Sequence, residues 1–295
     1  MPARPCLPAL SAFAGLVSWS GAVTAAMPDG PPPPLGLAWS LSVWTLAPLV
    51  ALVMLYVAGA RVTRHDARRG QHIAFCAAVL AVALALVWPL EAYTPYLLSA
   101  HVAQHMTLLA LVPPLLLAAG TGARVRAALP GRAGARAGAA GAQLAAFADR
   151  HLGAATLVHV LTMWCWHLPG AVAATMDSEA LHRLMLAHVL LAGLWFWRAV
   201  FARLRARDGS ATGACVALVT AMMLMGFLGA LLTFSPRLLY PVYTDTALLA
   251  GIDPMRDQQL AGLLMWVPTG VPYLAVCLLL AVALLRELPR SGRPA

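Results

Sequence analysis

The sequence predicts an all-α polytopic membrane protein, a seven-helix transmembrane bundle that follows an N-terminal signal-like segment. Of its 295 residues 61% are hydrophobic and only 11% are charged, whereas a soluble domain usually carries about 25% charged residues. The apolar residues form long blocks separated by Arg, Pro and Gly clusters, and no block alternates in polarity as a strand would. Helices are therefore the expected spanning element, because a helix satisfies its own backbone hydrogen bonds in lipid.

Seven apolar blocks have about the length of twenty residues that crosses a bilayer as a helix. They cover residues 37–59, 72–90, 96–119, 152–168, 181–201, 212–234 and 259–285. The fourth block is shorter than the others. Together they define one transmembrane domain over residues 37–286, which is followed by a short tail at 287–295.

The N-terminal 26 residues have the pattern of a targeting segment. Arg4 provides a positive charge, residues 7–17 are apolar, and the small residues at 23–26 suit a signal peptidase. Both a cleaved signal peptide and an uncleaved signal anchor fit this pattern. Residues 27–36 contain four consecutive prolines and predict a stiff, extended linker.

The distribution of arginine predicts the orientation in the membrane. The loops at 60–71, 120–151 and 202–211 and the C-terminal tail are rich in Arg, whereas the alternate loops hold only Arg237 and Arg256. By the positive-inside rule the C-terminus is cytoplasmic, in a plasma (inner) membrane. The net charge of +9 thus indicates topology rather than nucleic-acid binding. The Ala-, Gly- and Arg-rich stretch 120–149 predicts a mobile inside loop.

Histidines gather near the predicted outer surface. In the motif HVAQHM, which opens the third span, His101 and His105 are four residues apart, so both imidazoles lie on one helix face and can bind one metal ion. Met106 adds a thioether on a different side. The competing interpretation is a pair of interfacial histidines that bond to loop carbonyls.

The next two spans bring further imidazoles to similar depth. The motif MWCWHLP ends the fourth span with Cys165 and His167, and His159 lies deeper, where a hydrogen bond between helices is the alternative to a functional role. His182 and His188 are six residues apart, so they face different sides and serve different roles. We predict His101, His105, His167 and His188 as metal ligands, with Met106 or Cys165.

Imidazole, thioether and thiol ligands together favour Cu(I). Asp257 and Gln258 come just before the seventh span, and we expect them beside the metal ligands, where Asp257 orients an imidazole. The alternative is that Asp257 caps its own helix. Gly262 is expected to permit close helix approach, and Met222, Met223 and Met225 to serve packing.

The motifs HVAQHMTLLALVPPLLLAAG, WHLP, HRLMLAHVLLAGLWFW and DQQLAGLLMW, in this order, resemble the CtaG family of cytochrome c oxidase assembly factors, described for caa-type oxidases. The resemblance covers residues 37–285 and implies a role in making active haem–copper oxidase. Six residues of this chain match positions in the family's motifs: His101, His105, His167, His188, Asp257 and Gln258. His182 matches less closely. The Pro-rich leader and the Ala/Gly/Arg loop depart from the family pattern.

We therefore expect an assembly factor that binds or delivers copper at the outer membrane face. Its expected partners are the lipid bilayer, cytochrome c oxidase subunits and a copper chaperone. Two alternatives remain: a haem b-binding electron carrier that uses paired histidines, and a cofactor-free chaperone for oxidase subunits. The sequence contains no nucleophile–base set and no phosphate-binding loop, so we do not expect an enzyme.

Overall fold

The structure is a computed structural model, and it describes residues 28, 30–63, 68–205 and 211–287. The described residues form helices joined by turns, without strands. The predicted signal segment at 1–26 lies outside the described residues, as do most of the predicted tail and the short connections 64–67 and 206–210.

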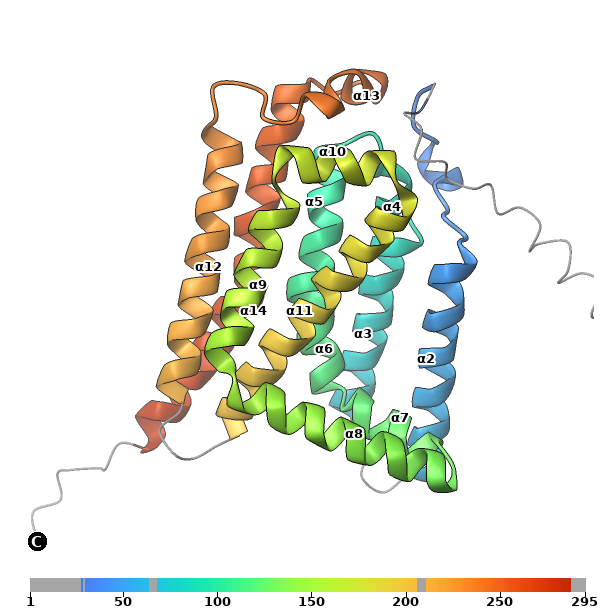
Figure 1. Cartoon of the computed structure of the whole chain (residues 1–295), viewed down its shortest axis with the longest axis vertical. Helices are drawn as coiled ribbons and strands as arrows, with labels where there is room; N and C mark the ends of the chain where they lie inside the picture. Colours follow the sequence, from blue (N-terminus) through green and yellow to red (C-terminus); the bar gives the residue numbers. More distant parts are fainter. Residues whose placement is uncertain (1–27, 29, 64–67, 206–210, 288–295) are drawn as a thin grey trace, which may run out of the picture.

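The predicted all-helical bundle is confirmed (Figure 1). Among the described residues six spans are long and apolar enough to cross a membrane alone, and the bent pair of α9 and α10, whose axes differ by 71°, makes a seventh when it is counted as one span. The spans are α2 (Val43–Val62), α3 (Arg69–Leu86), α5 (Leu98–Met106) with η2 (Thr107–Leu111) and α6 (Val112–Ala118), α9 (Leu152–Trp166) with α10 (Pro169–Asp177), α11 (Glu179–Arg205), α12 (Ala211–Phe234) and α14 (Pro254–Glu287).

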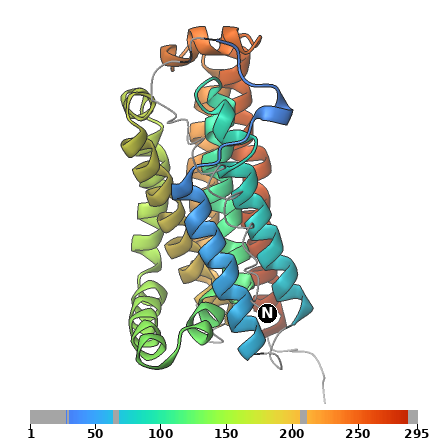
Figure 2. The same ribbon diagram turned by 90° about the vertical axis from the view of Figure 1, so that its right-hand side faces the viewer.

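The first span begins later than predicted. Residues Leu35–Leu37 form a separate 3₁₀ turn, η1, and α2 starts only at Val43. The Pro-rich segment before η1 is fixed to the bundle by side-chain donors: the Tyr93 hydroxyl bonds to the Pro33 carbonyl at 2.8 Å and the Trp88 indole to the Leu35 carbonyl at 2.7 Å. Figures 1 and 2 both show α2 at the edge of the bundle, beside α3.

The third span contains a π-helical segment, η2, between α5 and α6. Pro113 has no backbone N–H, so the Leu109 carbonyl cannot receive the usual helical hydrogen bond. The Trp197 indole of α11 donates to that carbonyl at 3.1 Å instead. Gly193 permits this contact, because a Cβ atom there would lie 2.6 Å from the Leu109 oxygen. The π segment is thus where α11 packs most closely on the third span.

The α12 and α14 helices also meet at glycines, as predicted for Gly262. A Cβ on Gly262 would lie 2.5 Å from the Gly229 carbonyl, and a Cβ on Gly229 would lie 2.8 Å from the Gly262 carbonyl. Small residues at such positions let two membrane helices approach with their backbones in contact.

Short helices lie at both ends of the bundle. One end, predicted to face outside, holds α4 (Leu90–Tyr93), α10, η3 (Pro241–Tyr243) and α13 (Thr244–Leu249); the other holds α7 (Thr121–Ala128) and α8 (Gly131–Arg150) (Figure 1). We call these the α13 end and the α8 end.

Residues 120–149 are not the irregular loop that the sequence suggested. Most of this stretch is α7 and α8, consistent with the strong helix propensity of alanine. Asp149 makes a bidentate ion pair with Arg198 of α11, with both N–O distances at 2.9 Å, and Arg203 donates to the Asp149 carbonyl. Phe147 also packs on Trp195, with ring centroids 5.6 Å apart. These contacts fix the end of α8 to α11.

Candidate functional site

The third span presents two imidazoles to the interior at the α13 end. His101 and His105 lie one turn apart on α5, as their spacing predicts, and their ring centroids are 4.3 Å apart. Both side chains are completely buried. They are therefore not interfacial histidines bonded to loop carbonyls, which was the alternative.

Two further histidines join this pair. His167, at the end of α9, places its ring centroid 5.4 Å from that of His105, and His182 of α11 places its ring 5.9 Å from His101. His167 is only 3% exposed. We call His101, His105, His167 and His182 the histidine cluster. Three separate spans contribute to it, so the predicted coincidence of depth is observed.

Most nitrogens of the cluster have no hydrogen-bond partner. They are both ring nitrogens of His101 and of His105 and the Nε2 atoms of His167 and His182, six in all. His167 Nδ1, in contrast, bonds to the Met163 carbonyl at 2.8 Å. Buried polar groups are nearly always paired, so unpaired nitrogens in this number indicate a place for a ligand.

The cluster fits a metal ion in its donor type and in its spacing. Neutral imidazole is the commonest metal ligand, and two imidazoles on one ion at about 2 Å have ring centroids roughly 4–6 Å apart. Within the described residues, however, no three His, Cys, Asp or Glu side chains are already placed to hold one ion. Binding would thus require the rings to rotate about their side-chain bonds.

Three predicted ligands lie apart from the cluster. His188 is exposed on α11, where its Nδ1 accepts a hydrogen bond from the Trp166 indole at 3.0 Å. Cys165 is exposed as well, although His167 two residues later is buried. Met106 is buried within the apolar core. The structure therefore brings together the imidazoles of the histidine cluster, whereas Cys165 is exposed and Met106 belongs to the apolar core.

Asp257 does not touch an imidazole, which differs from the predicted orienting role. Its carboxylate accepts hydrogen bonds from the backbone N–H of Leu98 at 2.7 Å and of Ser99 at 3.2 Å, and from the Ser99 hydroxyl. It thus caps α5, the helix that carries His101 and His105, rather than its own helix. The exposed Asp253 caps α14 by accepting from Arg256 N–H at 3.0 Å.

Gln258 fixes the loop between α12 and α13. Its Oε1 accepts from Leu239 N–H at 2.7 Å, and its Nε2 donates to the Arg237 carbonyl at 3.2 Å. The same loop places Tyr240, whose hydroxyl donates to the His167 carbonyl at 2.6 Å, and Tyr243, whose ring lies 6.4 Å from that of His101. Burial raises the pKa of both phenols, so they stay protonated. Gln258 therefore holds the loop that contacts the cluster.

Sequence reasoning missed a carboxylate beside the cluster. Glu91 of α4 accepts a hydrogen bond from Gln104 Nε2, and its Oε1 is 4.0 Å from His182 Nε2. Gln104 also donates to the Ala85 carbonyl at 2.9 Å. Gln104 stands between the two histidines of HVAQHM and could have been noticed, but no spacing in the sequence connects Glu91 to them.

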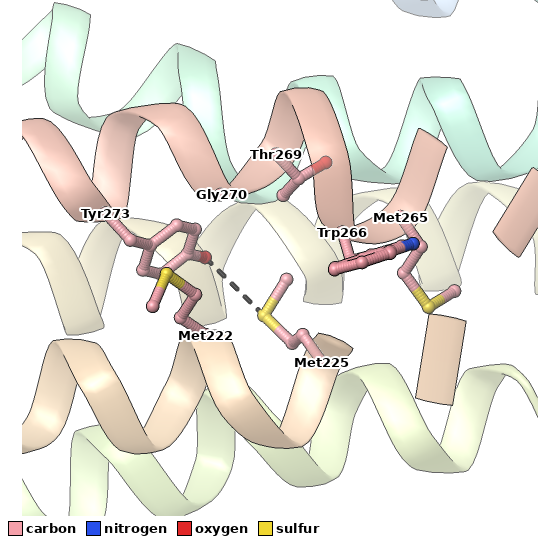
Figure 3. Close-up of a pocket in the computed structure, with 7 residues that line it drawn as sticks. All are labelled: Met222, Met225, Met265, Trp266, Thr269, Gly270 and Tyr273. Atoms are coloured by element: carbon pink, nitrogen blue, oxygen red, sulfur yellow. Dashed lines mark hydrogen bonds between the residues drawn. The ribbon is translucent and has the colours of Figure 1, made fainter. Parts of the chain in front are cut away.

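His159 forms a different, deeper polar contact. Its Nε2 hydrogen-bonds to the Tyr273 hydroxyl of α14 at 2.7 Å, and its ring stacks on Phe196 at 4.2 Å. The predicted helix–helix hydrogen bond is thus observed. Tyr273 also lines a cavity of about 10 Å³ with Met222, Met225 and Met265, and its hydroxyl is 3.7 Å from the Met225 sulfur (Figure 3). This volume corresponds to about one water molecule.

Comparison with known proteins identifies the family. The family model described as cytochrome c oxidase caa3 assembly factor (Caa3_CtaG) matches residues 54–287. No curated protein and no solved structure matches the chain. The match includes every span after the first, the whole histidine cluster, and Asp257 and Gln258. The chain therefore belongs to the family of cytochrome c oxidase caa3 assembly factors.

Proposed function

We propose that this assembly factor binds copper, as Cu(I), at the histidine cluster and passes it to cytochrome c oxidase subunits. The observation that carries the proposal is the set of six unpartnered imidazole nitrogens in one buried region. Copper is the cargo that a haem–copper oxidase needs, and imidazole is a suitable ligand for it. His101, His105 and His167 would hold the ion, with His182 as the fourth imidazole within reach.

The surroundings of the cluster support reversible binding rather than a permanent site. The rings are close together but are not arranged around one centre, so a bound ion would be held in a low and irregular coordination that Cu(I) accepts. The loop that carries Tyr240 and Tyr243 packs on the cluster from the α13 end. Rearrangement of this loop would open a path toward a copper chaperone or an oxidase subunit on that side.

The location in the cell belongs to the same proposal. The arginine pattern supports an orientation with the α8 end toward the cytoplasm, in which the histidine cluster would lie near the outer face of an inner membrane. On this orientation copper would be received and delivered outside the cytoplasm. The protein would act as a carrier and not as an enzyme.

Copper content of the purified protein tests the proposal. The full chain is loaded with Cu(I) under anaerobic conditions, freed of excess metal, and measured as wild type, His105→Ala and His188→Ala. We expect about one copper per chain in the wild type and in His188→Ala, whose imidazole is exposed away from the cluster, and a loss of copper in His105→Ala. Equal copper in all three proteins would refute the site, and a Soret band would indicate haem instead.

A cellular readout connects the site to assembly. In a deletion strain grown at limiting copper, His105→Ala should fail to restore oxidase activity although the protein inserts normally, whereas His188→Ala should restore it. Full restoration by His105→Ala would leave a cofactor-free chaperone as the function.

A further inference from the structure

The α8 end buries an arginine whose charge has no acidic partner among the described residues. Arg124 of α7 is only 5% exposed. Its Nη2 donates to Gln71 Oε1 at 2.6 Å, and its guanidinium carbon lies 5.1 Å from the centre of the Tyr56 ring. Its Nη1 has no acceptor. Neither neighbour carries a negative charge, so the guanidinium is stabilised only by a neutral amide and an aromatic face.

A second unpartnered group lies on the same helix, one turn before Arg124. Thr121 is 8% exposed, and its hydroxyl has no hydrogen-bond partner. Thr121 and Arg124 are three residues apart on α7, so their side chains share one face of the helix. Thr121 is the first residue of α7, where free backbone N–H groups and the helix dipole favour an anion. Two unpartnered donors and a helix N-terminus therefore occur together.

The backbone around Arg124 is closely packed. A Cβ atom on Gly59 of α2 would lie 1.9 Å from the Arg124 carbonyl oxygen, so α2 and α7 are in direct contact there. The Tyr56 ring stacks on Phe75 of α3 at 3.5 Å. The guanidinium is thus held between α2, α3 and α7. A buried charge in such a place is costly unless an anion pairs with it.

We propose that Arg124 and Thr121 bind a phosphate oxyanion, supplied by the headgroup of an anionic membrane lipid. The planar guanidinium matches the geometry of phosphate oxygens, and a threonine hydroxyl can donate to the same group. The lipid is the expected source because the site lies at the ends of two membrane spans, α2 and α3, where headgroups are found. The binding site would anchor α7, and with it α8, to the membrane surface.

Thermal unfolding of the purified full chain in a neutral detergent tests the proposal. Phosphatidylglycerol, phosphatidylcholine and inorganic phosphate are added separately to the wild type, Arg124→Gln and Arg126→Gln. Arg126 is the matched control, because it is an exposed arginine on the same helix. We expect phosphatidylglycerol to raise the melting temperature of the wild type and Arg126→Gln, and to bind Arg124→Gln about tenfold more weakly or worse.

A milder variant covers the case in which Arg124→Gln does not fold. Thr121→Val keeps the shape of the side chain and removes one donor, so it should reduce the lipid effect by a smaller factor. Stabilisation by inorganic phosphate to the same extent as by phosphatidylglycerol would support the oxyanion site and identify free phosphate as its source.

Two results would overturn the proposal. One is an equal shift by phosphatidylglycerol in the wild type, Arg124→Gln and Thr121→Val. The other concerns Asp66, which lies in the connection 64–67 outside the described residues. If Asp66→Asn destabilises the protein as much as Arg124→Gln does, and no lipid changes the wild type, then the counter-ion is Asp66 and not a phosphate.

Discussion

Two regions of this bundle bury imidazoles equally deeply, yet they satisfy them differently. His159 is completely buried, its Nε2 hydrogen-bonds to Tyr273 and its ring stacks on Phe196, so only its Nδ1 has no partner. His101 and His105 are also completely buried, but neither of them has a hydrogen-bond partner. The first arrangement is what a structural histidine needs to hold two helices together. The second arrangement sacrifices stability and is typical of a binding site.

The two ends of the bundle also differ in the charge of the ligand that we propose for each. Imidazole nitrogens at the α13 end can supply lone pairs to a cation, whereas the Arg124 guanidinium at the α8 end can only donate to an anion. In each case the protein leaves donors or acceptors unpaired where a membrane helix would otherwise pair them. Substitutions at either site are therefore expected to change ligand binding, which a purely structural role would not predict.

The largest expected effect is the response of stability to metal. Cu(I) at 100 times its dissociation constant should stabilise the wild type by about 2.7 kcal/mol, because it binds the folded protein alone. His105→Leu should show no such stabilisation, and Tyr273→Phe, which alters only the deeper His159 contact, should keep it. Melting temperatures with and without Cu(I) measure this. An equal response in all three proteins would mean that copper binds elsewhere.

In the metal-free protein, replacing a histidine should change the free energy of unfolding by a smaller amount. The direction of this change should differ between the two regions. His159→Leu should lower the free energy of unfolding by about 1–2 kcal/mol, because it breaks a hydrogen bond and leaves the Tyr273 hydroxyl with only the weak Met225 sulfur as a partner. His105→Leu should leave stability unchanged or raise it, because it removes two unpartnered nitrogens from the core. Denaturant titration of the metal-free wild type, His159→Leu and His105→Leu measures these free energies of unfolding. A marked loss in His105→Leu would place that residue among the structural histidines.

The spans could be predicted from the sequence, because hydropathy and length alone determine where helices cross a bilayer. The π segment could not, because it depends on which distant donor serves the Leu109 carbonyl that Pro113 leaves free. The same holds for α8. Its alanines favour a helix, but the glycines and arginines among them suggested a loop, and the ion pair between Asp149 and Arg198 becomes visible only in three dimensions.

The histidine cluster was predicted in part for a similar reason. The spacing of His101 and His105 places them on one face, and the end of α9 places His167 at similar depth. The six-residue spacing of His182 and His188 shows that they face different sides, but it does not tell which side meets the cluster. His188 was therefore predicted as a ligand, whereas in the structure it is the His182 ring that lies beside His101.

The smallest expected effect concerns Asp257, which acts on the cluster only through the α5 backbone. In Asp257→Asn one carboxylate oxygen becomes an NH₂ group that faces the N–H donors of Leu98 and Ser99, so the cap of α5 is weakened. The free energy of unfolding should fall by about 1 kcal/mol. The copper affinity should also fall, by less than about tenfold, since the first turn of α5 positions His101.

Asp253→Ala is the matched control for this prediction, because the exposed Asp253 caps α14 through a comparable contact with Arg256 N–H, and alanine removes that acceptor. It should cost a similar amount of stability but leave the copper affinity unchanged. Competition with a Cu(I) chelator measures the affinities, and denaturant titration measures the stabilities. If both variants lose copper affinity equally, the loss follows general destabilisation of the α13 end. If only Asp257→Asn loses it, the cap of α5 is a positioning element of the site, acting across the 158 residues that separate Ser99 from Asp257.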